Sequence, residues 1–194
     1  MILNRLRHQR SEPSEEQFLE KFHKYFPTGT LRAISEEALS TSDQAKQWKK
    51  WHDDINKNGP HNPEVTVQNY VLQMPEGNST YIRRQLDRSA RRWRNTVHLL
   101  DLKDQTRMGI RRFDFDPDSK QNPHPHVVGT VSEYPQEGYG TRGLKIMNAL
   151  SRGWFGLPLR SDLNLNENAI KTWDGLVRNG EAEYLDADWH YRFR

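Results

Sequence analysis

The chain has 194 residues, of which 34% are hydrophobic, and its formal net charge is +3. Its six tryptophans argue against complete disorder, because aromatic side chains supply much of the burial energy of a core. The absence of cysteine excludes disulfide bonds, cysteine nucleophiles and cysteine zinc sites, and no apolar run approaches the roughly 18 residues that span a membrane. We therefore expect a soluble cytoplasmic protein or a component of an assembled particle.

Residues 14–26 carry the clearest local signal in the first part of the chain. Their apolar side chains recur at helical spacing. These are Phe18, Leu19, Phe22, Tyr25 and Phe26. Ser14 and Gln17 stand three residues apart, as the two members of a capping box do. The sequence therefore predicts an amphipathic helix that begins just after Ser14.

Residues 1–95 as a whole are dense in charged side chains and are expected to form a polar, mainly helical extension. Residues 34–58 and 80–95 are predicted as further helices, and residues 64–74 alternate as a strand does. This region holds few aliphatic residues for a core of its own. We therefore expect it to become ordered against a protein partner or a second copy of the chain.

Residues 96–194 are expected to form a mixed α/β domain, because strand-like and helix-like patterns alternate along them. The predicted strands are residues 96–102, 107–116, 126–135, 157–165, 181–185 and 188–194, and the predicted helices are residues 144–156 and 167–180. The first two strands are separated by a short polar turn, which predicts a hairpin. The later order of strand, helix and strand predicts at least one crossover in a mixed sheet.

A glycine-rich stretch, EYPQEGYGTRGLKIMNAL (133–150), connects a predicted strand to a predicted helix. Glycines let the backbone come close to a pyrophosphate, and the unpaired N–H groups at a helix N-terminus favour an anion. A tight turn with no ligand explains the same glycines equally well. Both interpretations stay open on the sequence.

This stretch, with the block NENAIKTWDGLVRNGEAEYL, resembles the GNAT superfamily of N-acetyltransferases over residues 96–194. Gly138 and Gly140 match the two small-residue places of the family's Arg/Gln-x-x-Gly-x-Gly/Ala loop, and Asn166, Ala169 and Trp173 follow its later layout. The end of the chain also looks like GNAT-like proteins encoded by bacteriophages. The resemblance implies a GNAT-like central mixed sheet with flanking helices, and acetyl-CoA as the cofactor.

The resemblance also implies roles for individual residues. The group expected to hold the pyrophosphate of acetyl-CoA is Gly138, Gly140, Arg142 and Gly143. Asn166 would orient the cofactor or the attacking group, and Glu133 would accept the proton of the amine. Two positions depart from the family pattern: Pro135 stands at the Arg/Gln place, and Trp173 stands where many members have a tyrosine acid. No metal site is expected.

Two other functions are consistent with the sequence. The altered loop favours a non-catalytic virion or assembly protein that keeps the GNAT-like fold for packing. A nucleic-acid-binding module is the second alternative, because four arginines share one face if residues 80–95 are helical. They are Arg84, Arg88, Arg91 and Arg92. The same arginines could instead pair with carboxylates of the first part of the chain.

Overall fold

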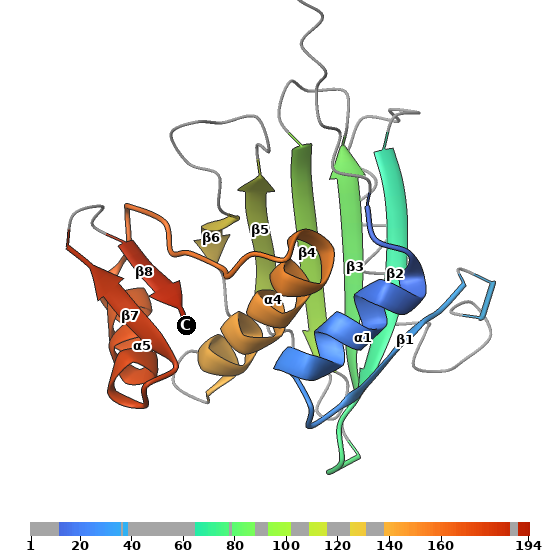
Figure 1. The fold of residues 1–194 in the computed structure, drawn as a ribbon, viewed down its shortest axis with the longest axis horizontal. Helices are drawn as coiled ribbons and strands as arrows, with labels where there is room; N and C mark the ends of the chain where they lie inside the picture. The colour runs from blue at the N-terminus through green and yellow to red at the C-terminus, as the bar shows by residue number, and fades with distance from the viewer. Residues whose placement is uncertain are drawn as a thin grey trace, which may run out of the picture.

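The computed structural model describes residues 12–35, 37–38, 65–77, 79–87, 93–101, 109–115, 125–130, 138–186 and 190–194. In these residues the fold is mixed α+β, with three helices and two antiparallel sheets (Figure 1). The mixed composition of helices and strands is as predicted. The predicted helices over residues 34–58 lie almost entirely outside the described residues.

The larger sheet has six strands, and each strand pairs antiparallel with the next along the chain. The strands are β1 (Thr30–Ala33), β2 (Val65–Gln73), β3 (Ser79–Asp87), β4 (Trp93–Asp101), β5 (Gly109–Phe115) and β6 (His126–Thr130). The smaller sheet pairs β7 (Ala182–Leu185) with β8 (His190–Phe193). The predicted β4–β5 hairpin and the predicted strand at residues 64–74 are confirmed.

A short segment, residues 159–161, connects the two sheets. Arg160 forms a parallel bridge with His126 of β6 and an antiparallel bridge with Arg192 of β8. The prediction of a full strand over residues 157–165 is therefore wrong. Pro158 offers no N–H to a ladder, and the side chain of Asp162 accepts a hydrogen bond from the N–H of Leu163 at 2.7 Å, which turns the chain away from the sheet.

Helix α1 (Glu15–Tyr25) begins where the capping box predicts. The Ser14 hydroxyl accepts a hydrogen bond from the Gln17 N–H at 3.3 Å, and the Gln17 side chain accepts one from the Ser14 N–H at 3.1 Å. Phe18 and Phe22 are buried on the inner face of the helix. The apolar face of α1 is therefore covered within the chain.

The predicted basic helix over residues 80–95 is wrong, because residues 80–87 belong to β3 and residues 93–95 belong to β4, while residues 88–92 lie outside the described part of the chain. A turn containing Gly77, with φ of +87°, reverses the chain after β2, and β3 then pairs with β2 along its whole length. Ile82, Arg84 and Leu86 alternate on one side of β3 and are all buried. Residues 80–84 are buried on both faces of this central strand, and its pairing with β2 and β4 outweighs the helical spacing of the arginines.

Helices α1 and α4 (Tyr139–Phe155) lie side by side across one face of the six-stranded sheet (Figure 1). The Phe18 ring of α1 stacks on the Trp154 ring of α4, with centroids 5.2 Å apart, and also contacts Tyr70 of β2. Residues on both sides of position 95 share this core, and position 95 itself lies within β4. Among the described residues, no helix is long and apolar enough to cross a membrane.

The first prediction concerns the α1–α4 contact. A Cβ added at Gly153 would stand 2.7 Å from Cδ2 of Phe18, so Gly153→Ala should reduce the free energy of unfolding by about 1–3 kcal/mol. Gly175→Ala in α5 (Glu167–Arg178) is the matched control, because the new Cβ would meet only the end of Arg178 at 3.9 Å; this substitution should stabilise the protein by about 0.5–1 kcal/mol. Urea unfolding measures both, and equal effects would contradict the packing role of Gly153.

The second prediction concerns pH. Burial, opposed in part by Arg84 and by a hydrogen bond with Trp154, raises the pKa of Tyr70 from 10.0 to about 12. The folded protein therefore holds this proton more tightly than the unfolded chain, and the resulting stability is complete below pH 10 and lost as the pH rises towards 12. The loss should be on the order of 2 kcal/mol. Tyr70→Phe should unfold with a shallower alkaline slope, and an unchanged slope would contradict the assignment.

Candidate functional site

The start of α4 is the part of the structure that the glycine-rich stretch builds. The helix begins at Tyr139, five residues before the predicted start, and Gly138 is its N-cap in the left-handed conformation, with φ of +79°. Among the described residues no side chain caps this end, and the N–H of Arg142 bonds to the carbonyl of Gly138 at 3.1 Å. The N–H groups of residues 139–141 therefore have no partner within the helix.

The glycines predicted to hold a pyrophosphate occupy different positions at this helix end. A Cβ at Gly138 would meet nothing within 4 Å, whereas a Cβ at Gly140 would lie 3.6 Å from the Thr172 hydroxyl of α5. Gly143 is buried in the second turn of α4, away from the exposed end. Gly138 and Gly140 thus lie at the open helix end, and Gly143 serves the packing of the helix.

Arg142, the cation of the predicted site, lies one turn into α4 and faces the β2–β3 turn. Its Nη2 atom stands 3.5 Å from Oε1 of Glu76, which is half exposed. This separation is long for an ion pair, and exposed pairs contribute about 0–1 kcal/mol. An anion at the start of α4 would therefore compete with Glu76 for the guanidinium group.

The backbone around α4 forms a strand, helix and strand unit with a parallel pair. The N–H of Val127 bonds to the carbonyl of Arg160 at 3.0 Å, and the N–H of Arg160 bonds to the carbonyl of Pro125 at 2.9 Å. Among the described residues these two bonds make the only bridge between β6 and residues 159–161. Beyond this bridge β6 leads along the chain to α4, and residues 159–161 lead to α5. Ligands of α/β proteins commonly bind where parallel strands end and a helix begins.

Asn166 begins a different helix, and Glu133 lies outside the described residues. Asn166 is the N-cap of α5 (Glu167–Arg178), and its Oδ1 accepts a hydrogen bond from the N–H of Ala169 at 2.9 Å. The carbonyl oxygen of this side chain is thus used to start the helix. Glu133 belongs to residues 131–137, which the structure does not describe, so its role as a base stays a prediction.

Trp173 is a core residue, as its position on the apolar side of α5 suggests. Its ring is 2% exposed and packs between Tyr191, at 5.8 Å, and Phe193, at 5.2 Å. The Tyr191 hydroxyl donates a hydrogen bond to Oδ1 of Asp174 at 2.8 Å. Burial first, and then this contact with Asp174, raises the pKa of Tyr191 to about 12.

The sequence carries no local signal for this Tyr191–Asp174 pair. The two residues lie on different elements, β8 and α5. No local spacing joins them, and only the packing of the last strand against α5 brings them together.

Arg84 is not available to a nucleic acid, contrary to the face predicted for residues 80–95. Its side chain is 1% exposed, donates to Gln68 at 2.8 Å, and forms an ion pair with Glu12 at 2.8 Å. Its guanidinium group also lies over the Trp154 ring, 4.1 Å from the centroid. Arg88, Arg91 and Arg92 lie outside the described residues.

Comparison of the chain with known protein families, with curated proteins and with solved structures finds no match. Among the described residues, no three side chains of the metal-ligating types gather closely enough to hold a metal ion. The geometry at the start of α4 is therefore the observation on which a function has to be argued.

The third prediction separates capping from ligand binding at Asn166. Asn166→Ala should reduce the free energy of unfolding by about 1 kcal/mol, because the N–H of Ala169 loses its acceptor. Asn166→Asp keeps the acceptor and should retain nearly full stability, although it loses the amide donors. Thermal unfolding of the two variants tests this, and a destabilised Asn166→Asp protein would show that the amide group makes a further contact.

Proposed function

We propose that the chain binds acetyl-CoA at the start of α4 and transfers the acetyl group to an amine, with a GNAT-like arrangement of β6, α4, residues 159–161 and α5. The observation that carries the proposal is the uncapped N-terminus of α4, where a Cβ at Gly140 would lie 3.6 Å from the Thr172 hydroxyl of α5. The order of elements along the chain also supports the resemblance to the GNAT superfamily. It is β6, α4, residues 159–161, α5 and the β7–β8 hairpin.

The physical case for a diphosphate rests on three features of this helix end. Unpaired N–H groups and the positive end of the helix dipole stabilise an anion. Gly138 leaves the space beside these groups open, because a Cβ there would meet no atom within 4 Å. Arg142 stands one turn further on and can exchange its long contact with Glu76 for a charge-assisted contact with phosphate.

Acetyl-CoA, when bound, supplies an acetyl thioester whose carbonyl carbon forms a bond with the amine nitrogen as the C–S bond breaks. The residue proposed to accept the ammonium proton is Glu133. Trp173 is buried between aromatic rings and carries no acidic group, so it cannot protonate the leaving sulfur. The Tyr191 hydroxyl is a weak acid that donates its hydrogen bond to Asp174, so we propose that water protonates the leaving sulfur.

A non-catalytic assembly function is the second candidate, and one set of contacts favours it. Three residues of the proposed site already make structural contacts: Asn166 caps α5, Gly143 packs inside α4, and Arg142 faces Glu76. A chain that keeps the GNAT-like arrangement for packing alone would show these contacts and no affinity for acetyl-CoA. The two candidates therefore differ in one measurable property.

The fourth prediction uses the two ends of α4 as a matched pair. Gly138 and Gly156 both have positive φ, +79° and +69°, and a Cβ at either would meet nothing within 4 Å. Replacing either by alanine should cost about 1–2 kcal/mol of stability through backbone strain. Only Gly138→Ala should weaken acetyl-CoA binding, by about tenfold or more, because it also obstructs the approach to the helix end.

Isothermal titration calorimetry with acetyl-CoA, supported by thermal shift, measures this difference. A ligand present at about 100 times its dissociation constant stabilises the folded state by about 2.7 kcal/mol. The absence of heat and of any shift at millimolar acetyl-CoA would overturn the proposal in favour of the assembly function. Equal weakening by both substitutions would show that the ligand does not contact the start of α4.

A further inference from the structure

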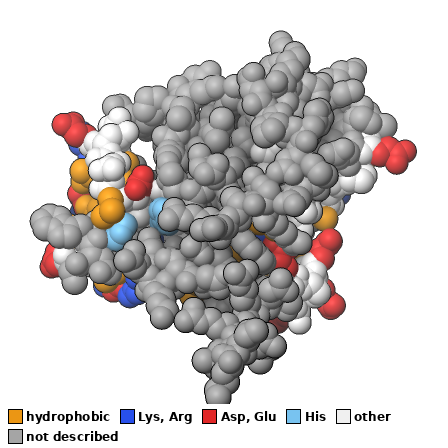
Figure 2. All heavy atoms as spheres, turned by 90° about the horizontal axis from the view of Figure 1, so that it is seen from above, with side chains coloured by type: hydrophobic (Ala, Val, Ile, Leu, Met, Phe, Trp, Pro, Cys, Tyr) orange, Lys and Arg blue, Asp and Glu red, His pale blue; other side chains and the backbone are white. Residues whose placement is uncertain are grey.

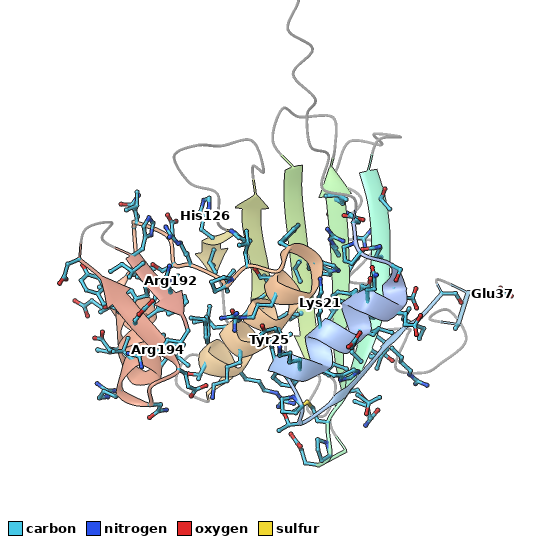
Figure 3. The ribbon with its side chains drawn as sticks, viewed as in Figure 1. Lys21, Tyr25, Glu37, His126, Arg192 and Arg194 are labelled. Carbon is cyan, nitrogen blue, oxygen red and sulfur yellow. The ribbon has the colours of Figure 1, made fainter. Side chains whose placement is uncertain are left out.

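Helix α5 and the β7–β8 hairpin form one end of the molecule, at left in Figure 1. Arg192 of β8 is labelled at this end in Figure 3, where side chains project outward at left. Acidic, basic and hydrophobic side chains all reach the surface here, at left in Figure 2. Three of the four large apolar side chains that are exposed in the described part of the chain belong to this end: Leu163, Ile170 and Tyr184, with exposed fractions of 63%, 38% and 42%. This concentration makes the end of the molecule a candidate interaction surface.

Four charged side chains of α5 form a stripe along the helix, and their signs alternate. They are Glu167, Lys171, Asp174 and Arg178. Because an α-helix turns about 100° per residue, the four lie within an arc of about 60°. The buried residues Trp173 and Leu176 project on the opposite side, towards the hairpin. The stripe therefore lies on the outer side of α5.

The charges of the stripe do not pair along the helix, although their spacing allows it. Glu167 and Lys171 stand four residues apart, a spacing at which opposite charges commonly pair. Within the described part of the chain, however, neither of them nor Arg178 forms an ion pair, and all three are exposed. Asp174 accepts the Tyr191 hydrogen bond through Oδ1, which leaves Oδ2 for another donor. These groups can therefore pair with charges of a second molecule.

The order of charges along the stripe is complementary to its own reverse. Glu167 and Arg178 lie at equal distances from the midpoint of the stripe, on opposite sides of it. Lys171 and Asp174 do the same, closer to the midpoint. When two such helices lie antiparallel, a carboxylate of one therefore stands level with a cation of the other at every position of the stripe. A two-fold axis generates each of these contacts twice.

Apolar side chains flank the stripe on one side. Ile170 and Val177 stand two turns apart along that side of α5, and Val177 is half-buried. In the antiparallel pair, Ile170 of one copy lies within one turn of the level of Val177 of the other. The Tyr184 ring belongs to the same side, because it lies 4.9 Å from the ring of Tyr191, which bonds to Asp174. Apolar burial beside the stripe would add to the ion pairs.

We propose that the outer side of α5 is a homodimer interface, in which the stripe packs antiparallel against the stripe of a second copy of the chain. The occupant is a second copy, because the charges complement themselves around a two-fold axis, whereas a parallel arrangement would set like charges opposite each other. One helix face is a small interface, so the dimer forms in a concentration-dependent way and weakens as salt screens the ion pairs.

This interface is separate from the site proposed for acetyl-CoA. The α5 residue that approaches the start of α4 is Thr172, whose hydroxyl lies beside Gly140. At about 100° per residue, Thr172 projects more than about 90° away from the centre of the stripe. The homodimer proposal therefore stands whether or not acetyl-CoA binds.

Reversal of single charges tests the pairing, with the association of the full chain measured by analytical ultracentrifugation at low ionic strength. The wild type should show a monomer–dimer equilibrium. Glu167→Lys should weaken dimerisation by about tenfold or more, because two cations then meet at both ends of the interface. Arg178→Glu should have the same effect, because two carboxylates then meet. Glu20→Lys makes the same charge change at an exposed position of α1 and is the matched control, so it should dimerise as the wild type does.

An equimolar mixture of the Glu167→Lys and Arg178→Glu proteins identifies the partner. In the mixed dimer the two altered residues meet each other and the two unaltered residues meet each other, so the affinity should return to near that of the wild type. Circular dichroism checks that each variant is folded. A wild type that stays monomeric at millimolar concentration would overturn the proposal. Weakening by both reversals without recovery in the mixture would also overturn it, because the charges would then meet a different surface.

Discussion

The contact of Trp154 with its neighbours holds the described structure together. Phe18 stacks on its ring from α1, and the guanidinium group of Arg84 lies over it from β3. Arg84 is in turn neutralised by Glu12 and bound by Gln68, so the buried charge has its hydrogen bonds satisfied. One aromatic ring thereby joins two helices to the centre of the sheet. Since Trp154 is near the end of α4, this contact sets where the whole helix lies, including its distant N-terminus.

Side chains of α4 also position the residues that follow the helix. The Ser151 hydroxyl donates to the carbonyl of Leu157 at 2.7 Å, and the side chain of Asn148 accepts from the N–H of Leu159 at 3.1 Å. These buried polar contacts guide residues 159–161 to their place between β6 and β8. This placement lets Arg160 form bridges with both His126 of β6 and Arg192 of β8.

Several elements could be predicted because their signals are local. The capping box of Ser14 and Gln17 and the alternation of residues 64–74 both act within a few residues, and the structure contains both of them. Residues 80–95 misled the prediction because arginine favours helices, and four of the arginines recur at helical spacing. Pairing with β2 and β4 overrode that preference. Nothing local could indicate that Arg84 would be buried under Trp154.

The sequence by itself determined where α1 begins and that residues 64–74 form a strand, because both signals are contained in neighbouring residues. It also pointed to the glycines at the start of α4, although not to the turn at which that helix begins. Tertiary structure decided which strands are neighbours, and so decided that Tyr191 meets Asp174 and that Arg160 stands opposite Arg192. The physical reason is that strand pairing and helix packing join residues that are distant along the chain. Backbone hydrogen bonds and apolar surfaces can form with many partners, so the local sequence does not indicate which segment will be the partner.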